Sequence, residues 1–281
     1  MAKHRFNKKK YLLAIALTAI ILVVATFLTI WLTGYRMIKY ETNEHGVIRF
    51  LGKVSDGNIP FDGNLYFSDG TTAKIQNATE ITYSNGDVYK GEVDSLLPHG
   101  NGLMKYSGGN SYEGEFKFGY PNGKGTYKYS NGDTYTGDIK YGKKDGYGTY
   151  TWCPDMDGNS DTYQGEYKDD LRWGNGTYTW ANGSVYVGTY EADSKNGEGK
   201  ITFANGDTYE GEFEYDYRTG KGKYVWKNGE IYEGDFFQNQ ITGYGTLTWV
   251  SGSTRHNYTG YFVNGIITPV ENGAEDTENA E

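Results

Sequence analysis

Two patterns of hydrophobic and polar residues divide this chain of 281 residues. Residues 11–34 are almost continuously apolar, which predicts a helix long enough to cross the ~30 Å hydrocarbon core of a bilayer. Beyond residue 80, aromatic and polar residues alternate in short runs separated by turn residues, which is the pattern of β-strands with one apolar face. The sequence therefore predicts an all-β protein preceded by one N-terminal transmembrane helix.

The β region is built from one repeated signature, Tyr-x-Gly-x-(aromatic or β-branched). It occurs eight times at intervals of 23 to 28 residues, beginning at Tyr89, Tyr112, Tyr135, Tyr163, Tyr186, Tyr209, Tyr232 and Tyr258. A period of this size indicates a tandem array. Most copies follow a Gly-x-Gly block and a pair such as Asn131-Gly132, which favours a type I′ turn with positive φ at both central residues. Each repeat is thus predicted to be a β-hairpin that needs stacked neighbours for stability.

Side-chain alternation predicts what each face of the sheet carries. Gly174, Gly176, Tyr178 and Trp180 have the same parity and share one face. A glycine leaves a strip of bare backbone over which a neighbouring ring can lie, burying on the order of 150–250 Å². The opposite face is polar and includes an acidic residue at the fourth signature position of six repeats, namely Glu92, Glu115, Asp138, Glu166, Glu212 and Asp235.

Units such as Tyr209-Glu210-Gly211-Glu212-Phe213, preceded by Gly197-Glu198-Gly199, resemble MORN repeats (membrane occupation and recognition nexus). The resemblance covers residues 81–267, or about eight repeats. It implies an elongated, twisted antiparallel sheet whose aromatic face forms a shallow groove. It also implies roles in scaffolding, oligomerisation or lipid contact, without pointing to one partner.

These patterns predict five segments along the chain. They are a basic cytoplasmic tail at 1–10, a transmembrane helix at 11–34, a juxtamembrane segment with a degenerate β cap at 35–80, the repeat domain at 81–267, and an acidic disordered tail at 268–281.

The flanking charges predict the orientation of the membrane helix. Five basic residues precede the apolar run and only Arg36 and Lys39 follow it closely, so the N-terminus is expected in the cytoplasm and the repeat domain outside. A cleaved signal peptide is the alternative. Signal peptides have an apolar core of about 7–15 residues and a small-residue cleavage site, neither of which is found here.

The exported part of the chain is acidic. All 36 acidic residues lie after position 40, together with 20 of the 27 basic ones, so this part has a net charge of −16. Such a surface disfavours nucleic acid and anionic lipid headgroups. The single cysteine, Cys153, excludes an internal disulfide.

The sequence predicts a non-enzymatic function. The four histidines are dispersed, and no nucleophile elbow, zinc-protease helix or phosphate-binding loop is present. We expect a membrane-tethered scaffold or adaptor for protein–protein interaction at the cell envelope, including self-association. The alternative is a module that binds lipid headgroups or cell-surface polysaccharide. For either, the candidate binding residues are the rings of the aromatic face, Tyr129, Trp152, Trp180, Phe203, Trp226 and Trp249.

One loop has the oxygen-ligand pattern of a weak calcium site. Asp155, Asp157, Asn159 and Asp161 stand at alternate positions, and Glu166 falls at the twelfth position from Asp155. The glycine expected at position six is absent, and no flanking helices are predicted. A polar turn rich in Asp, Asn and Gly is therefore the alternative. No other cofactor is expected.

Overall fold

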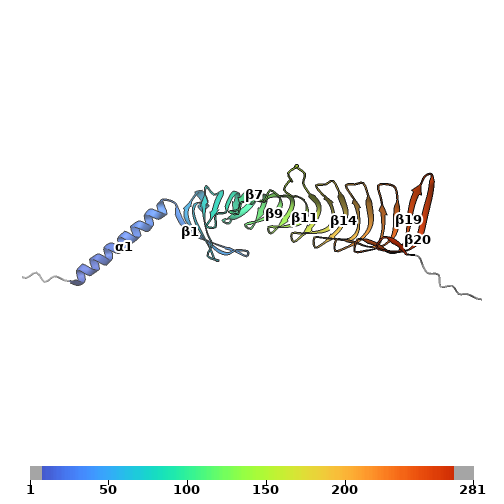
Figure 1. The fold of residues 1–281 in the computed structure, drawn as a ribbon. Helices are drawn as coiled ribbons and strands as arrows, with labels where there is room; N and C mark the ends of the chain where they lie inside the picture. Colours follow the sequence, from blue (N-terminus) through green and yellow to red (C-terminus); the bar gives the residue numbers. More distant parts are fainter. Residues whose placement is uncertain (1–7, 269–281) are drawn as a thin grey trace, which may run out of the picture. The chain divides into compact units, whose positions relative to one another are not determined.

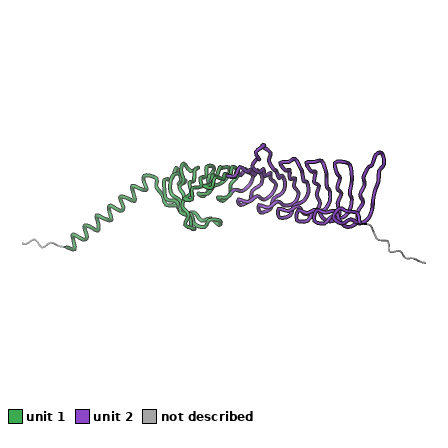
Figure 2. Tube along the Cα trace, in the orientation of Figure 1, with its two compact units in different colours: residues 1–120 green, residues 121–281 purple. Residues whose placement is uncertain are grey.

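The computed structural model describes residues 8–268, in which one helix precedes an antiparallel β-sheet of 21 strands (Figure 1). This architecture confirms the predicted fold class. The chain divides into two compact units, residues 1–120 and residues 121–281 (Figure 2). The predicted acidic tail lies outside the described residues except for Thr268, as does the basic N-terminal tail up to residue 7.

Unit 1 holds the helix α1 and eight strands that pair in chain order, β1 with β2 and so on to β8. The elements are α1 (Lys8–Leu32), β1 (Tyr35–Thr42), β2 (Gly46–Val54), a 3-10 turn (Asp56–Asn58), β3 (Pro60–Phe67), β4 (Thr72–Gln76), β5 (Glu80–Tyr83), β6 (Val88–Asp94), β7 (Leu97–Lys105) and β8 (Ser111–Lys117). The region before the first signature is thus occupied by five paired strands.

Unit 2 continues the same pattern without helices among its described residues. Its strands also pair in chain order, from β9 to β21. They are β9 (Tyr120–Lys128), β10 (Thr134–Lys140), β11 (Lys143–Thr151), β12 (Thr162–Lys168), β13 (Leu171–Thr179), β14 (Val185–Glu191), β15 (Ser194–Thr202), β16 (Thr208–Glu214), β17 (Tyr217–Val225), β18 (Ile231–Phe237), β19 (Gln240–Ser251), β20 (Thr254–Val263) and β21 (Ile266–Thr268).

The turn chemistry differs from the prediction. At the Asn-Gly pairs only the glycine has positive φ, for example +95° at Gly132, and Tyr129 and Asp133 close a three-residue loop. This is the type I turn followed by a left-handed glycine, not the predicted type I′ turn. Two successive positive φ values, which a type I′ turn requires, occur at the other ends of the hairpins instead. An example is Tyr215-Asp216, with φ of 46° and 72°.

Tyr163 shows how a signature tyrosine packs over two facing glycines. Gly165 is opposite Gly176, and a Cβ added at Gly176 would lie 2.5 Å from the ring of Tyr163. The Tyr163 hydroxyl donates a hydrogen bond to the carbonyl of Glu166 at 3.0 Å. The tyrosines at the first seven signature positions are all 0% exposed. The glycines are therefore required as space for the rings, as the shared face predicted.

The fifth signature residue joins one repeat to the preceding one. The ring of Tyr167 packs edge-on against Tyr163 of its own repeat and against Tyr135 of the repeat before it. In unit 2 such contacts form an unbroken series with centroid separations of 4.9–5.6 Å and interplanar angles of 78–90°, through Tyr135, Tyr167, Tyr163, Tyr190, Tyr186, Phe213, Tyr209, Phe236, Tyr232, Phe262 and Tyr258. Each edge-to-face pair contributes about 0.5–1.5 kcal/mol beyond area burial.

We predict that Gly222→Ala lowers the free energy of unfolding by about 1–3 kcal/mol, because overpacking a filled core displaces its side chains. The new Cβ would lie 2.6 Å from Cε2 and Oη of Tyr209. The matched control is Gly108→Ala, where no heavy atom lies within 4 Å. It should leave stability unchanged or raise it by less than about 1 kcal/mol. Urea unfolding followed by circular dichroism measures both, and equal effects would contradict the steric role of the glycine pair.

Candidate binding groove

The hairpins of unit 2 bend at a bulge in the Gly-x-Gly block. Gly165 pairs with Gly176 but Glu166 pairs with Trp173, so Gly174 and Asn175 have no partner in that ladder. Gly174 has a φ of +59°, and a Cβ there would meet the Glu166 carboxylate at 2.6 Å. Oε1 of Glu166 accepts the Asn175 N–H at 3.0 Å. The acidic residue at the fourth signature position therefore holds the bulge, which bends the strand.

This bend makes the face that carries the signature tyrosines concave. A straight strand separates residues 172 and 178 by about 20 Å. In the structure, Cζ of Arg172 lies 5.7 Å from the ring centroid of Tyr178 and 5.0 Å from that of Tyr190. The Arg172 side chain therefore reaches back over the inner side of its own strand. We call this face the inner face and its hollow in unit 2 the inner groove.

In each of four repeats a Lys or Arg side chain lies over aromatic rings of the inner face. The four occupy the same repeat position, and the backbone N–H of each donates to the second residue of the next type I′ turn: Lys144 to Asp170, Arg172 to Asp193, Lys195 to Asp216 and Arg218 to Asn239. Ion pairs join Arg172 to Asp193 at 3.1 Å and Lys195 to Asp216 at 2.7 Å. Burial acts to raise the pKa of Asp216, but hydrogen bonds from Lys195 outweigh it and hold that pKa below its usual value.

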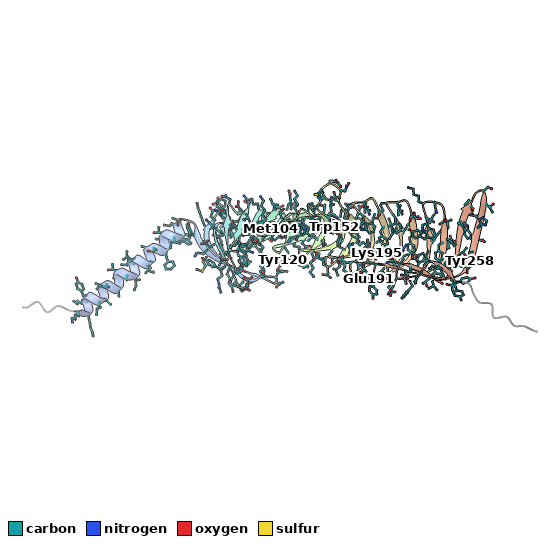
Figure 3. All side chains as sticks on the ribbon, viewed as in Figure 1. Met104, Tyr120, Trp152, Glu191, Lys195 and Tyr258 are labelled. Atoms are coloured by element: carbon teal, nitrogen blue, oxygen red, sulfur yellow. The ribbon has the colours of Figure 1, made fainter. Side chains whose placement is uncertain are left out.

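The six rings proposed from the sequence all lie half-buried on the inner face, at the loop end of the strands. Tyr150 contacts Trp152 at 4.6 Å between ring centroids, and Trp152 contacts Tyr178 at 5.2 Å. Tyr178 in turn contacts Trp180 at 4.7 Å. Ile201 interrupts this second series, which resumes with Phe203, Tyr224 and Trp226. Side chains along the sheet, with Trp152 and Lys195 labelled, are drawn in Figure 3. A binding role for the six rings remains a prediction.

Carboxylates in the loops connect successive repeats. Asp207 accepts hydrogen bonds from the Tyr224 hydroxyl at 2.7 Å and from the Lys227 N–H at 2.8 Å. Asp161 accepts the corresponding bonds from Tyr178 at 2.5 Å and from Ala181 at 2.7 Å. Burial, reinforced by the bond to Asp207, raises the pKa of Tyr224 to about 12, so its hydroxyl stays a donor at neutral pH. Sequence reasoning missed these links, although the fixed spacing from each loop Asp to a later Tyr could have indicated them.

The structure does not gather the residues of the proposed calcium loop into a metal site. Asp161 bonds to Tyr178 and Ala181, and Glu166 holds the bulge of its own hairpin. Oδ1 of Asp155 accepts the N–H groups of Asp157 and Asn159 at 2.9 Å, as in a polar turn. Across residues 8–268, no group of three or more His, Cys, Asp or Glu side chains is arranged to hold a metal ion. Side-chain oxygens of Asp155, Asp161 and Glu166 are thus engaged in a turn and in hairpin and repeat contacts.

We predict an acid-dependent loss of stability that Asp207→Asn makes shallower. Hydrogen bonds from the Lys227 N–H and the Tyr224 hydroxyl hold the pKa of Asp207 below its usual value. A lowered folded-state pKa stabilises the protein above the unfolded pKa, and this stability is lost as pH falls through the folded pKa. The urea midpoint should therefore be constant from about pH 7 to 5 and fall below about pH 4.

The Asp207→Asn variant should be less stable than the parent at neutral pH and should lose less stability on acidification. The control is Asp157→Asn, in an exposed loop, which should leave the pH profile unchanged. Parallel profiles for the parent and Asp207→Asn would contradict the assignment.

Comparison with solved structures finds two TCP domains at low identity. The TCP10 domain of Danio rerio CPAP, solved in complex with a peptide of Danio rerio STIL, is 12% identical with a TM-score of 0.38, and the match covers 71% of this chain and 94% of that one. The SAS-4 (dCPAP) TCP domain of Drosophila melanogaster, solved with a proline-rich motif of Ana2 (dSTIL), is 16% identical with a TM-score of 0.27, covering 71% and 90%. No match was found among curated proteins.

The MORN repeat model matches the chain seven times, at residues 89–111, 112–134, 135–155, 163–185, 186–208, 209–231 and 232–254. The expected count of about eight repeats is corrected to seven. The signature at Tyr258 is followed only by the three-residue strand β21 and so does not complete a second full strand. Because the matches cover more than half of its length, this chain belongs to the MORN repeat family.

Proposed function

We propose that the protein is a non-catalytic scaffold, tethered to a membrane by α1, that binds another protein in the inner groove of unit 2. The observation that carries this proposal is the open inner groove, where half-buried rings and cations of successive repeats form one continuous surface. Among residues 121–268, every strand belongs to the single sheet, so no second layer of this unit covers the groove. Rings and cations whose surface is incompletely buried are typical of protein-binding surfaces.

Unit 1 contains an example of a chain segment that packs beside a turn of the same type. Its turn at Ser95-Leu96 has positive φ at both residues, like the turns beside the cations of unit 2. The β1–β2 hairpin packs nearby, with Nε2 of His45 hydrogen-bonded to the Phe118 carbonyl at 2.8 Å and the His45 ring stacked on Tyr120 at 5.0 Å. Leu96 is 3% exposed, whereas Asp216, at the matching turn position of unit 2, has a side chain that is 50% exposed. In unit 1 the β1–β2 hairpin covers the surface beside this turn. In unit 2 an extended segment of a partner protein would bind the corresponding surface.

The tether rests on the properties of α1. The helix has 25 residues, none of them buried, and is long and apolar enough to cross a membrane. At 1.5 Å per residue it spans about 37 Å, against ~30 Å of hydrocarbon. Its threonine hydroxyls donate to carbonyls one turn earlier, for example Thr18 to Ala14 at 2.9 Å and Thr26 to Leu22 at 2.7 Å. Such bonds satisfy polar groups that lipid cannot. The basic N-terminus supports an N-in orientation, with the repeats outside.

The alternative ligand class is a lipid surface or a cell-surface polysaccharide. Half-buried Trp and Tyr rings can stack on sugars or insert at a membrane interface. The acidic net charge of the exported part argues against anionic lipid. Flotation of residues 41–281, which lack α1, with neutral and anionic vesicles tests whether the repeats themselves bind lipid.

We predict that a partner is captured from the inner face and not from the outer one. A photoreactive benzoylphenylalanine placed at Trp180 or Phe203 in the full chain should give a discrete adduct on irradiation of the source cells. Val187, on the outer face and 53% exposed, is the matched position and should give none. Mass spectrometry of the adduct identifies either another protein or a second copy of this chain. No adduct at the inner positions, or equal labelling at Val187, would contradict the proposal.

We predict that the chain stays in the membrane pellet after alkaline carbonate washing and that its intact mass includes residues 1–34. Protease added outside the cytoplasmic membrane should digest the repeats. Ile21→Arg combined with Val23→Arg should release the protein, because each Arg at a helix centre costs about 2.5–3.5 kcal/mol. Ile21→Leu with Val23→Leu is the control and should remain in the pellet. A secreted product lacking the apolar segment would identify it as a signal peptide.

A further inference from the structure

The cation series of the inner groove has one exception at its C-terminal end. In three repeats the second residue of the next type I′ turn is an aspartate: Asp170, Asp193 and Asp216. In the fourth repeat it is Asn239. At this turn position the fourth repeat thus has an amide in place of a carboxylate of the same shape.

The hydrogen bonds at the exception are the same as at an ordinary repeat. Oδ1 of Asp193 accepts the N–H of Arg172 at 2.9 Å and its Nε–H at 3.1 Å, and the Asp193 carbonyl accepts from Nη2 at 2.6 Å. Oδ1 of Asn239 accepts the same two groups of Arg218 at 3.0 and 3.3 Å, and its carbonyl accepts from Nη2 at 2.9 Å. The geometry is kept and only the negative charge is lost.

Arg218 is therefore a half-buried cation without a carboxylate partner among residues 8–268. No ion pair within 4.0 Å joins it to any described Asp or Glu. Burial lowers the pKa of Arg218, and the neighbouring groups that act against this are the phenols of Tyr224 and Tyr209. A charge removed from water without an opposite charge is unfavourable, so this site favours an anion.

A cavity of about 250 Å³ opens beside this cation. It is lined by Arg218, Tyr224, Trp226 and Phe236 on the inner face, and by Asn239, Gln240, Ile241, Asn264 and Gly265 toward the last turns. The guanidinium Cζ lies 5.4 Å from the Tyr224 ring centroid and 5.7 Å from that of Phe236. Nε and Nη2 of Arg218 already donate to Asn239. The site thus combines the positive charge of this guanidinium with apolar walls, which suits a carboxylate carried on a short aliphatic stem.

We propose that this cavity is a carboxylate-binding site and that the chain's own C-terminal segment, residues 269–281, occupies it with an acidic side chain. This segment contains Glu271, Glu275, Asp276, Glu278 and Glu281 and no basic residue. Its charge is therefore complementary to the unpaired Arg218. An acidic side chain of this segment would supply the negative charge that Asn239 does not provide to Arg218.

The position of the segment makes this occupant physically reachable. Gly265 lines the cavity, and the strand β21 ends three residues later at Thr268. At about 3.3 Å per extended residue, six residues of chain between Gly265 and Glu271 reach at most roughly 20 Å. A tether of this length gives an effective concentration on the order of millimolar. A free acidic partner would instead have to approach an exported region with a net charge of −16.

The test uses the full chain in detergent with the five tail carboxylates changed to amides (Glu271→Gln, Glu275→Gln, Asp276→Asn, Glu278→Gln and Glu281→Gln). The probe is a fluorescent peptide of residues 269–281, followed by anisotropy at low salt. The neutralised chain should bind the peptide saturably at one site. The unmodified chain should bind it at least tenfold more weakly, because its own segment competes.

Asn239→Asp in the neutralised chain should weaken peptide binding at least tenfold, since it restores the carboxylate found in the other three repeats without changing shape. Arg218→Gln should do the same. Asn228→Asp is the matched control, because it adds the same charge in a loop of the same repeat outside the cavity lining, and it should change affinity by less than threefold. Circular dichroism checks that each variant is folded.

Three results would overturn the proposal. The first is the lack of saturable binding to the neutralised chain. The second is equal binding by Asn239→Asp and Asn228→Asp, which would show a diffuse charge effect. The third is equal binding by the neutralised and unmodified chains, which would assign the site to a carboxylate of another molecule and not to the chain's own segment.

Discussion

The packing of a tyrosine ring over two facing glycines is the constraint on which the rest of the array depends. It requires glycine at matched positions of adjacent strands, because a Cβ at Gly176 or Gly222 would lie within 2.6 Å of a ring. It buries the tyrosine completely while its hydroxyl bonds to a backbone carbonyl of the same strand. A single-layer sheet has no opposing layer from which to build a core. Here the core is made within the layer, from rings that lie along the strands instead of projecting away from them.

The two faces of the sheet consequently have different roles. The outer face carries polar pairs such as Lys200–Glu210 at 3.2 Å and Lys223–Glu233 at 2.5 Å, which are exposed and contribute little to stability. The inner face carries the buried tyrosines, the half-buried loop rings and the cations brought over them by the bulge. The packed core and the proposed binding surface thus share one face, and the bulge that bends each strand also shapes the hollow. In unit 2 the hollow is a by-product of how each repeat fills its own core.

Sequence alone predicted the features that follow from period and parity: the antiparallel hairpins, the separation of ring and polar faces, and the glycine-over-ring packing. It missed features that depend on three-dimensional closure. The type I′ turns at Ala192-Asp193 and Tyr215-Asp216 lack the Asn-Gly signal, because hydrogen bonds between repeats stabilise their positive φ values. The acidic residues at the fourth signature position were interpreted as a solvated face, yet Glu166 holds a bulge. The cations Lys144, Arg172, Lys195 and Arg218 recur at the repeat interval, but the sequence did not show the bulge that brings them over the rings.

The edge-to-face series also sets how this protein can change in length. Each fifth-position ring inserts between the tyrosine of its own repeat and that of the repeat before it, as Tyr190 does between Tyr186 and Tyr163. Junctions between repeats that carry a ring at the fifth position therefore have the same form, whereas Ile139 takes this position in the repeat that starts at Tyr135. Insertion or deletion of one whole repeat leaves each remaining junction unchanged, and lengthens or shortens the groove by two strand spacings, about 10 Å. A chain of this architecture can therefore gain or lose length one repeat at a time while the remaining edge-to-face junctions keep their form.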